Sequence, residues 1–323
     1  MARNSTFCCA GCGSRGASIA RTYNPTELFK NILPDGYIYK CGACGLCQVD
    51  HTAVDQKNLA ALYKDSYRLS KPLDPGQVHN KFTVRAWIFR DLIRRYFKGT
   101  PRAIFEPGCG FGHSLMYFRR YFPDCRVYTH ELDVNSLGAG IDVFDPFRDR
   151  GKMFDVILMS HLLEHIVHPR EYIRRMIDLL APGGLLIIEV PNDNMHFLSR
   201  KWIVEPHVTF FDKISLTRFF EHFDAQLQIK ECFTAKGTDI LEPLLEPAAA
   251  IRYHIKNVLR GVLKSNPVTR TMLSTYQRGR KPPEVHPEPV DFSLMKRRYR
   301  LFAPPAHENA GWGLRMVLQK RTQ

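Results

Sequence analysis

The chain has 323 residues, enough for one large domain and a small one, and 44% of them are apolar, as in a protein with a hydrophobic core. Its first residues lack the apolar segment of a secretion signal, and no apolar run is long enough to span a bilayer, so we expect a soluble cytoplasmic protein. The net charge of +14 indicates that the protein binds an anionic partner.

Two CxxC pairs, each followed by a glycine, lie near the start of the chain: Cys9-Ala-Gly-Cys12 and Cys41-Gly-Ala-Cys44. In a cytosolic chain such short-spaced cysteines indicate a metal rather than disulfides. Four thiolates at this spacing close a tetrahedral structural zinc site that has no open coordination position. We therefore expect a zinc ribbon over residues 1–50, in which the spare Cys8 or Cys47 could replace a neighbouring ligand.

A helical pattern follows over residues 51–98. LAALYKDSY (59–67) has the spacing of a short amphipathic helix, KPLDPG (71–76) interrupts it, and FTVRAWIFRDLIRRYF (82–97) resumes an apolar stripe. This region is predicted to be a helical connector, and it is a candidate cap over an active site.

Strand and helix patterns alternate from residue 99 to 240. The buried strand RAIFE (102–106) leads into the turn GCGFG and a helix. The strands RVYTHE, FDVILM and LLIIEV follow in this order. The helix PREYIRRMIDLL and the turn APGG come before the last of these strands. The alternation predicts an α/β fold with a doubly wound, mostly parallel sheet. Ligands of such sheets bind at the carboxyl ends of the strands, where the glycine turn lies.

The glycine turn follows an acidic residue, Glu106, and contains Gly108, Gly110 and Gly112. A carboxylate at this point would repel the pyrophosphate of a nicotinamide dinucleotide. S-adenosylmethionine carries no phosphate, and its ammonium group would be attracted by the carboxylate. Glu131 ends the next strand, where it could accept hydrogen bonds from both ribose hydroxyls.

These residues carry a family resemblance. FEPGCGFG, THELD, FDVILMSHLLEHIVHP and LLAPGGLLIIEVPN, in this order over residues 102–233, resemble the class I S-adenosylmethionine-dependent methyltransferases. The segment His161-Leu-Leu-Glu164-His165 resembles the subgroup with an HxxEH motif. Together with a preceding zinc ribbon, it is similar to the sugar C- and O-methyltransferases of polysaccharide and natural-product pathways.

The resemblance implies a seven-stranded Rossmann-like sheet whose last strand is antiparallel, and GWGLRMVLQKR (311–321) is expected to form that strand within residues 308–323. Residues 241–307 would then be a basic helical and Pro-rich insertion before it. The resemblance also implies cofactor contacts. Glu106 and the three glycines would hold the methionine part and Glu131 the ribose, Asp142 or Asp145 would lie near the adenine, and Ser160 and His161 would line the pocket.

Methyl transfer to a hydroxyl or carbon acid requires removal of a proton from the acceptor, and histidine is suited to this near neutral pH. His207, in EPHVTFFDKISL, follows the fifth strand and is the favoured base. His165 is the next candidate and His161 the third. Glu164 would orient His165 or cap a helix, and a metal at the HxxEH segment is a further alternative.

The positive charge is concentrated late in the chain, with twelve Lys or Arg against three Asp or Glu between residues 251 and 300. IRYHIKNVLRGVLK (251–264) resembles a helix that either packs on the main domain or contacts a membrane surface. The sequence thus favours methyl transfer to a small anionic acceptor, such as a nucleotide-linked or phosphorylated sugar or a glycan precursor. An RNA methyltransferase and a non-catalytic basic zinc-ribbon binding protein are the alternatives. The RNA alternative is disfavoured because the fourth strand lacks an Asn/Asp-Pro-Pro-aromatic loop.

Overall fold

The computed structural model describes residues 7–25, 29–66, 75–134, 137–138, 140–192, 202–203, 206–235 and 313–322. The basic insertion predicted at residues 241–307 lies outside the described residues. Among the helices that are described, none is both long and apolar enough to cross a lipid bilayer.

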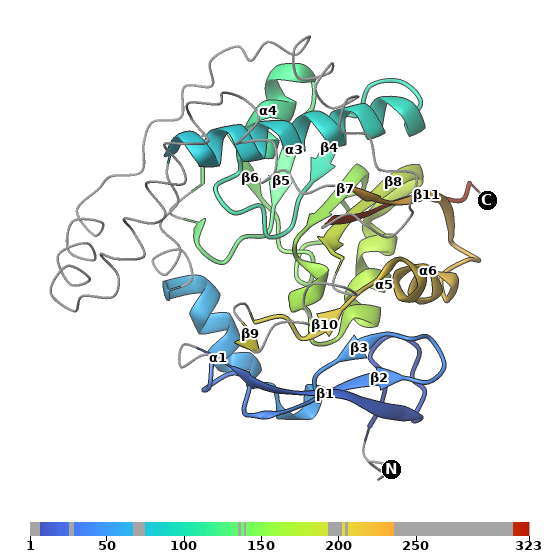
Figure 1. Ribbon diagram of the computed structural model, residues 1–323. Coiled ribbons are helices and arrows are strands. Elements are labelled where there is room, and N and C mark those ends of the chain that lie inside the picture. The colour runs from blue at the N-terminus through green and yellow to red at the C-terminus, as the bar shows by residue number, and fades with distance from the viewer. Residues whose placement is uncertain are drawn as a thin grey trace, which may run out of the picture.

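The central sheet has seven strands in the order β11-β12-β8-β7-β4-β5-β6 (Figure 1). Its strands are β4 (Ala103–Phe105), β5 (Arg126–Thr129), β6 (Asp142–Val143), β7 (Phe154–Ser160), β8 (Leu180–Pro191), β11 (Leu227–Ala235) and β12 (Gly313–Lys320). The pairs among β4 to β8 are parallel, whereas β12 is antiparallel to both of its neighbours, β8 and β11. The predicted doubly wound sheet and its antiparallel last strand are confirmed.

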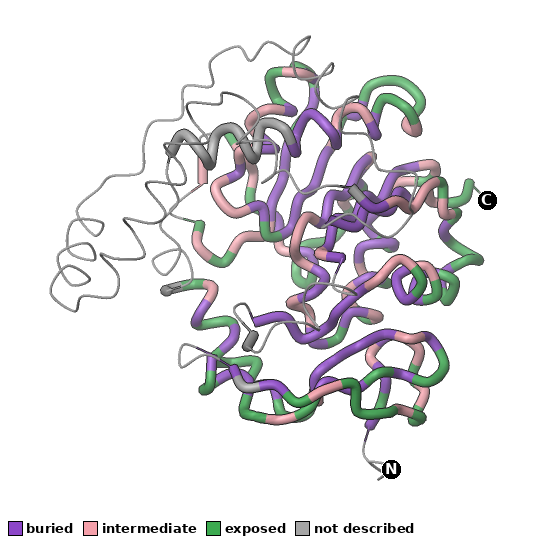
Figure 2. The backbone as a smooth tube through the Cα atoms, in the orientation of Figure 1, coloured by how far each residue is buried: buried purple, intermediate pink, exposed green. Residues whose placement is uncertain are grey.

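Helices cover both faces of this sheet. On one face α3 (Pro75–Tyr96) and α4 (His113–Tyr121) pack against the strands in one hydrophobic cluster, and on the other face α5 (Pro169–Leu179) and α6 (Lys213–Glu221) pack in a second cluster. Figure 2 shows the central strands buried between these layers. The three-layer arrangement leaves the ends of the strands as the place for a ligand.

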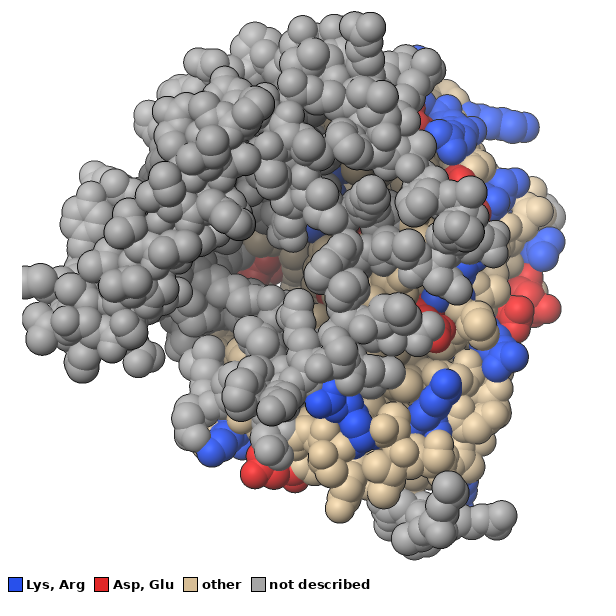
Figure 3. Space-filling model, viewed as in Figure 1, with Lys and Arg blue, Asp and Glu red and all other residues tan. Residues whose placement is uncertain are grey.

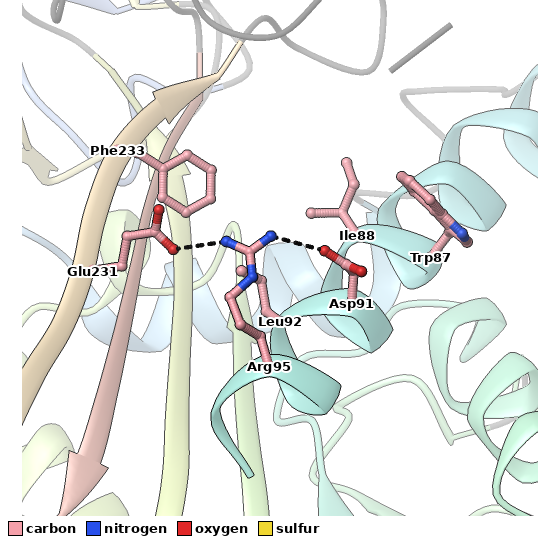
Figure 4. Close-up of a pocket in the computed structure, with 7 residues that line it drawn as sticks. All are labelled: Trp87, Ile88, Asp91, Leu92, Arg95, Glu231 and Phe233. Atoms are coloured by element: carbon pink, nitrogen blue, oxygen red, sulfur yellow. Dashed lines mark hydrogen bonds and ion pairs between the residues drawn. The ribbon is translucent and has the colours of Figure 1, made fainter. Parts of the chain in front are cut away.

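The predicted helical connector consists of several short pieces and one long helix. After the 3₁₀ turn His51–Ala53 come α1 (Gln56–Ala61), the π-helical turn Leu62–Ser66 and then α3. The second half of α3 lies against β11, where Asp91, Arg95 and Glu231 form ion pairs at the edge of a small pocket (Figure 4). Most of the connector therefore belongs to the helical layer of the central domain.

One boundary differs from the sequence prediction. The turn APGG was predicted to separate α5 from the next strand, but β8 begins directly at Leu180 and contains it. The pairing of β7 with β8 shifts its register between Phe154 and Val156, and Gly183 has a φ of 75°. A bulge in the strand accommodates the glycines, since an extra residue in a strand can be taken up in this way.

The N-terminal sheet has five strands in the order β10-β3-β2-β1-β9. Its strands are β1 (Ala17–Pro25), β2 (Gly36–Cys41), β3 (Cys47–Gln48), β9 (Trp202–Ile203) and β10 (Thr209–Phe210). The last two come from the segment that follows β8, so this sheet is completed by the central domain (Figure 1). The N-terminal module, defined here as residues 7–66, therefore does not form its sheet alone.

The module also shares a hydrophobic core with the central domain. Cys9, Cys41, Cys44 and Leu46 belong to the same cluster of buried side chains as Phe219 of α6. The Phe219 side chain is fully buried, whereas Ile214 on the same helix is 59% exposed. Since both parts contribute to one core, we expect them to unfold together.

Replacement of Phe219 by alanine should lower the free energy of unfolding by about 3–5 kcal/mol, because it opens a cavity between α6 and the module. Urea unfolding followed by fluorescence and by circular dichroism would measure this loss. The matched change Ile214→Ala should alter the free energy by less than about 0.5 kcal/mol. Two separate transitions in the parent protein would contradict the shared core.

Candidate active site

The glycine turn lies at the carboxyl end of β4, as predicted. Gly108, Gly110 and Gly112 all have positive φ angles, between 64° and 74°, a conformation that favours glycine. The space beside Gly110 is open, with no atom within 4 Å of where a Cβ would lie, whereas a Cβ on Gly112 would collide with Ile141. The backbone at Gly110 is therefore free to approach a ligand closely.

Glu106 is buried at the end of β4, with 4% of its surface exposed. Burial raises the pKa of its carboxyl group to about 8, although Arg85 opposes this shift. Its Oε2 atom has no hydrogen-bond partner within the described part of the chain. A buried carboxyl group without a donor fits a ligand that brings a cation, and the ammonium group of S-adenosylmethionine is such a cation.

Glu131 lies beside the glycine turn and accepts hydrogen bonds from backbone amides. Its Oε2 atom accepts from the Gly110 N–H at 2.8 Å, and its Oε1 atom accepts from the Leu132 N–H at 2.9 Å. The carboxylate therefore orders the turn.

The two aspartates considered for the adenine lie in different places. Asp142 is within β6 and forms an exposed ion pair of 2.7 Å with Arg126, the first residue of β5. Asp145 lies beyond the carboxyl end of β6 and accepts a hydrogen bond of 2.9 Å from the Phe147 N–H. Asp145 is thus the one at the edge of the sheet that carries the glycine turn.

His161 follows β7 directly and has a φ of 51°, the one positive φ among the described non-glycine residues. A strained backbone of this kind must be held by its surroundings. Its ring Nδ1 atom is 3.3 Å from Glu164 and its ring Nε2 atom is 3.4 Å from Glu189. Its backbone N–H donates to the Glu189 backbone carbonyl at 2.8 Å. Burial and Arg85 disfavour the charged ring, but the two carboxylates outweigh them and raise the pKa of His161.

Glu189 is almost fully buried and is the centre of an ion-pair cluster. Arg315 from β12 lies 3.2 Å from its Oε1 atom and Arg85 from α3 lies 3.5 Å from its Oε2 atom. Burial alone would favour the neutral acid, yet Arg315, Arg85 and His161 hold the pKa of Glu189 well below its usual range. The carboxylate is therefore ionised.

His165 and His207 lie against each other, with ring centroids 4.7 Å apart in an edge-to-face arrangement. The Nδ1 atom of His165 is 2.7 Å from the hydroxyl of Tyr63, which comes from the N-terminal module, and 3.2 Å from the Pro206 carbonyl. Glu164 is fully buried beside both rings, and His161, His165 and His207 outweigh its burial and lower the pKa of its carboxyl group. Predicted catalytic residues that are far apart in the sequence thus form one cluster.

The same cluster offers a set of metal ligands. Glu164, His165 and His207 each have a ligand atom, and these atoms lie within 4.8 Å of one another. Two histidines and a carboxylate are a donor set that zinc and other divalent ions accept.

The four predicted cysteine ligands also lie together. Their sulfur atoms are within 4.8 Å of one another, with Cys9 and Cys44 separated by 3.6 Å and Cys12 and Cys41 by 3.5 Å. Sulfur atoms on one tetrahedral zinc ion would be about 3.8 Å apart, since each Zn–S bond is about 2.3 Å. All nine cysteines are free thiols, so none of the four is held in a disulfide. The donor set fits zinc.

Charged side chains show no single patch on the face seen in Figure 3. There the described Lys and Arg residues are scattered over the surface with Asp and Glu among them. This face alone does not account for an anionic partner, which leaves the buried cations at the strand ends as the stronger indication.

Four residues of the site were missed by the sequence analysis: Tyr63, Arg85, Glu189 and Arg315. A signal existed for two of them, because Glu189 and Arg315 are charged residues within otherwise apolar strands, and a buried charge requires a partner. Tyr63 gave no signal, since its contact with His165 spans 102 positions.

Comparison with known proteins agrees with this fold. Residues 82–228 match a family model described as a methyltransferase domain. Methyltransferase str2 of Strobilurus tenacellus is 33% identical over 101 residues, which are 28% of this chain and 36% of that protein. The ubiquinone biosynthesis O-methyltransferase of Chelativorans sp. is 25% identical over 141 residues, which are 38% of this chain and 56% of that protein.

Among solved structures, the plantazolicin methyltransferase BpumL in complex with SAH shares the fold with a TM-score of 0.50 at 16% identity, and the match covers 81% of this chain and 94% of BpumL. The chain spans about a third of the length of the first curated relative and about half of the Chelativorans protein. The seven-stranded sheet with its antiparallel last strand is thus the fold of this solved methyltransferase, and residues 82–228 match a methyltransferase domain.

Replacement of Glu106 by glutamine should stabilise the ligand-free protein above neutral pH. The native carboxyl group has a raised pKa of about 8, so the folded state retains a proton that the unfolded state has lost. The stability contributed by this proton is present below pH 4.5 and is lost as the pH rises to about 8. The variant should therefore gain about 2–4 kcal/mol relative to the parent at pH 9 and little at pH 4.

Urea unfolding at a series of pH values would measure this difference. Glu221→Gln, at an exposed carboxylate of α6, should leave the pH dependence unchanged. Equal stability of parent and Glu106→Gln at every pH would show that the buried carboxyl group is not destabilising.

Proposed function

We propose that this protein transfers a methyl group from S-adenosylmethionine to a small anionic acceptor, with a nucleotide-linked or phosphorylated sugar or a glycan precursor as the favoured class. The observation that carries the proposal is the pair of histidines, His165 and His207, at the strand ends of a methyltransferase domain. A methyltransferase needs a base only where its acceptor must lose a proton, and imidazole is suited to that task.

The cofactor would lie across the carboxyl ends of β4 to β7. In this proposal Glu106 pairs with its ammonium group, and the turn containing Gly108, Gly110 and Gly112 admits its chain and ribose, since the space beside Gly110 is open. Glu131 would accept from the ribose hydroxyls. Asp145 is favoured over Asp142 for the adenine because it lies beyond the end of β6.

Two further residues would line the pocket. Ser160 ends β7 and its buried hydroxyl has no hydrogen-bond partner among the residues described, so it is available to a ligand. His161 would hold its neighbours in place, because both of its ring nitrogens already face carboxylates.

When bound, S-adenosylmethionine supplies a methyl group already activated by its sulfonium sulfur. The remaining task of the protein is to align the acceptor and remove its proton. His207 would accept that proton, and the ionised Glu164 beside it would stabilise the imidazolium that forms. His165 is fixed between Tyr63 and the Pro206 carbonyl, which suits a residue that orients its neighbour, and it is the second candidate for the base.

Replacement of His207 by alanine should leave the affinity for S-adenosylhomocysteine nearly unchanged, because the cofactor residues lie elsewhere. Turnover should fall by roughly two to four orders of magnitude. A panel of nucleotide-linked and phosphorylated sugars with labelled S-adenosylmethionine would identify the acceptor, and calorimetry would measure cofactor binding. The exposed His222→Ala, at the end of α6, is the matched control and should keep full turnover.

Retention of most of the turnover in His207→Ala would remove His207 from the mechanism and transfer the role of base to His165. A protein that fails to bind S-adenosylhomocysteine at all would contradict the proposed activity itself.

We also propose that Cys9, Cys12, Cys41 and Cys44 hold one structural zinc ion. The spacing of their sulfur atoms supports a closed tetrahedral site, and Gly13 and Gly45 after each pair have positive φ angles of 77° and 79°. Because Tyr63 of the same module contacts His165, and β3 pairs with β10 just after His207, the ion would stabilise one wall of the site.

Elemental analysis of freshly purified protein should find one zinc ion per chain. Cys44→Ser should lose the ion and lower turnover more than it lowers cofactor affinity, because the affected contacts lie beside His207. The control Cys232→Ser, outside the cysteine set, should keep the ion. Parent protein without zinc would contradict the ribbon.

A further inference from the structure

A row of polar side chains crosses the central sheet on the face covered by α3. Side chains alternate between the faces of a strand, so Ser160, Glu189 and Arg315 share the face of the α3 cluster members Leu158, Ile187 and Val317. They also lie at one level, because Ser160 pairs with Glu189 and Glu189 pairs with Arg315. Polar groups thus replace apolar ones at the carboxyl end of an otherwise hydrophobic face.

Arg315 is the least satisfied member of this row. Its side chain is fully buried, and of its donors Nη2 faces Glu189 at 3.2 Å, whereas Nε and Nη1 have no hydrogen-bond partner within the described residues. A guanidinium group has five N–H donors, and leaving buried donors unpaired is unfavourable. Such an arginine would be stabilised by a second anionic group.

The charges around Arg315 also favour the binding of a second anionic group. Two cations, Arg85 and Arg315, face the same carboxylate of Glu189 in a region with little access to water. An anion that entered the site beside Arg315 would face a cation, and ion pairing is strong in such surroundings.

The position of Arg315 separates it from the cofactor residues. Glu106 ends β4, and β12 is three strands away through β7 and β8. Strands are about 4.8 Å apart, so the two backbones are separated by roughly 14 Å. Arg315 and Glu106 thus lie at different places along the edge of the sheet.

We propose that Arg315 binds a carboxylate or phosphate group of the methyl acceptor, beside and not within the cofactor site. This inference rests on the proposed function and makes it more specific, because it assigns a residue that selects an anionic acceptor. The two donors of Arg315 that lack partners, Nε and Nη1, lie on different edges of the planar guanidinium, so each would donate a single hydrogen bond to an oxygen atom of an anion on its side.

The test uses the full-length protein saturated with S-adenosylhomocysteine and inorganic pyrophosphate as the probe, with binding measured by calorimetry. Pyrophosphate should bind, and Arg315→Met should weaken its affinity at least tenfold. Arg315→Lys keeps the positive charge but loses the planar set of N–H donors, and it should weaken the affinity by a smaller factor than Arg315→Met does. Arg174→Met, at an exposed arginine of α5, is the matched control and should leave the affinity unchanged.

Three results would overturn the inference: no binding of pyrophosphate to the saturated protein, equal affinity in the parent and both Arg315 variants, or displacement of pyrophosphate by S-adenosylhomocysteine. The last would assign the arginines to the carboxylate of the cofactor. Arg315→Lys keeps the inference testable if Arg315→Met does not fold. Since the readout is anion binding and not turnover, its failure is distinguishable from a failure of the proposed methyl transfer.

Discussion

The ionised carboxylate of Glu189 is the interaction on which the arrangement of the site depends. Removing an ion from water costs several kcal/mol in a protein interior, so Glu189 can be buried only while its cations surround it. The two arginines come from separate parts of the chain, Arg85 from α3 and Arg315 from β12, and His161 from the end of β7 lies beside them. The backbone carbonyl of Glu189 also holds the His161 N–H, which stabilises a strained φ angle. One residue thus connects a helix, a loop and the last strand.

The second wall of the site comes from the N-terminal module. Backbone hydrogen bonds join Val49 to the Val208 carbonyl and Val208 to the Glu164 carbonyl, so the segment around His207 is held between the module and the HxxEH turn. Strands β9 and β10 extend the sheet of the module with residues of the central domain. The boundary predicted at residue 50 therefore marks a change of sequence pattern, and residues from both sides of it form the candidate active site.

The features that sequence reasoning found are local ones. The glycine turn, the CxxC pairs and the alternation of strands and helices each occupy a short stretch, and their geometry follows from residue types at fixed spacing. The seven strands and the antiparallel last strand were expected from the family resemblance, because the four motifs occur along the chain in the order typical of that family. The bulge at the start of β8 was not predicted, because APGG has the composition of a turn and only pairing with β7 draws it into the strand. The partners of Glu189 and the contact of Tyr63 with His165 join segments that are far apart in the sequence. Local spacing patterns do not predict such contacts.

The order of the strands along the chain has a consequence for how the protein is made. β12 is the last of the described strands to leave the ribosome, yet it lies between β8 and β11 within the sheet. Until it arrives, β11 has no neighbour to pair with, and the edge of β8 is open to other nascent chains. Glu189 is synthesised 126 positions before Arg315, so it must stay hydrated through this interval. Completion of the sheet and dehydration of the active site are therefore one late event, and a chain that stops short of residue 313 would emerge with both unfinished.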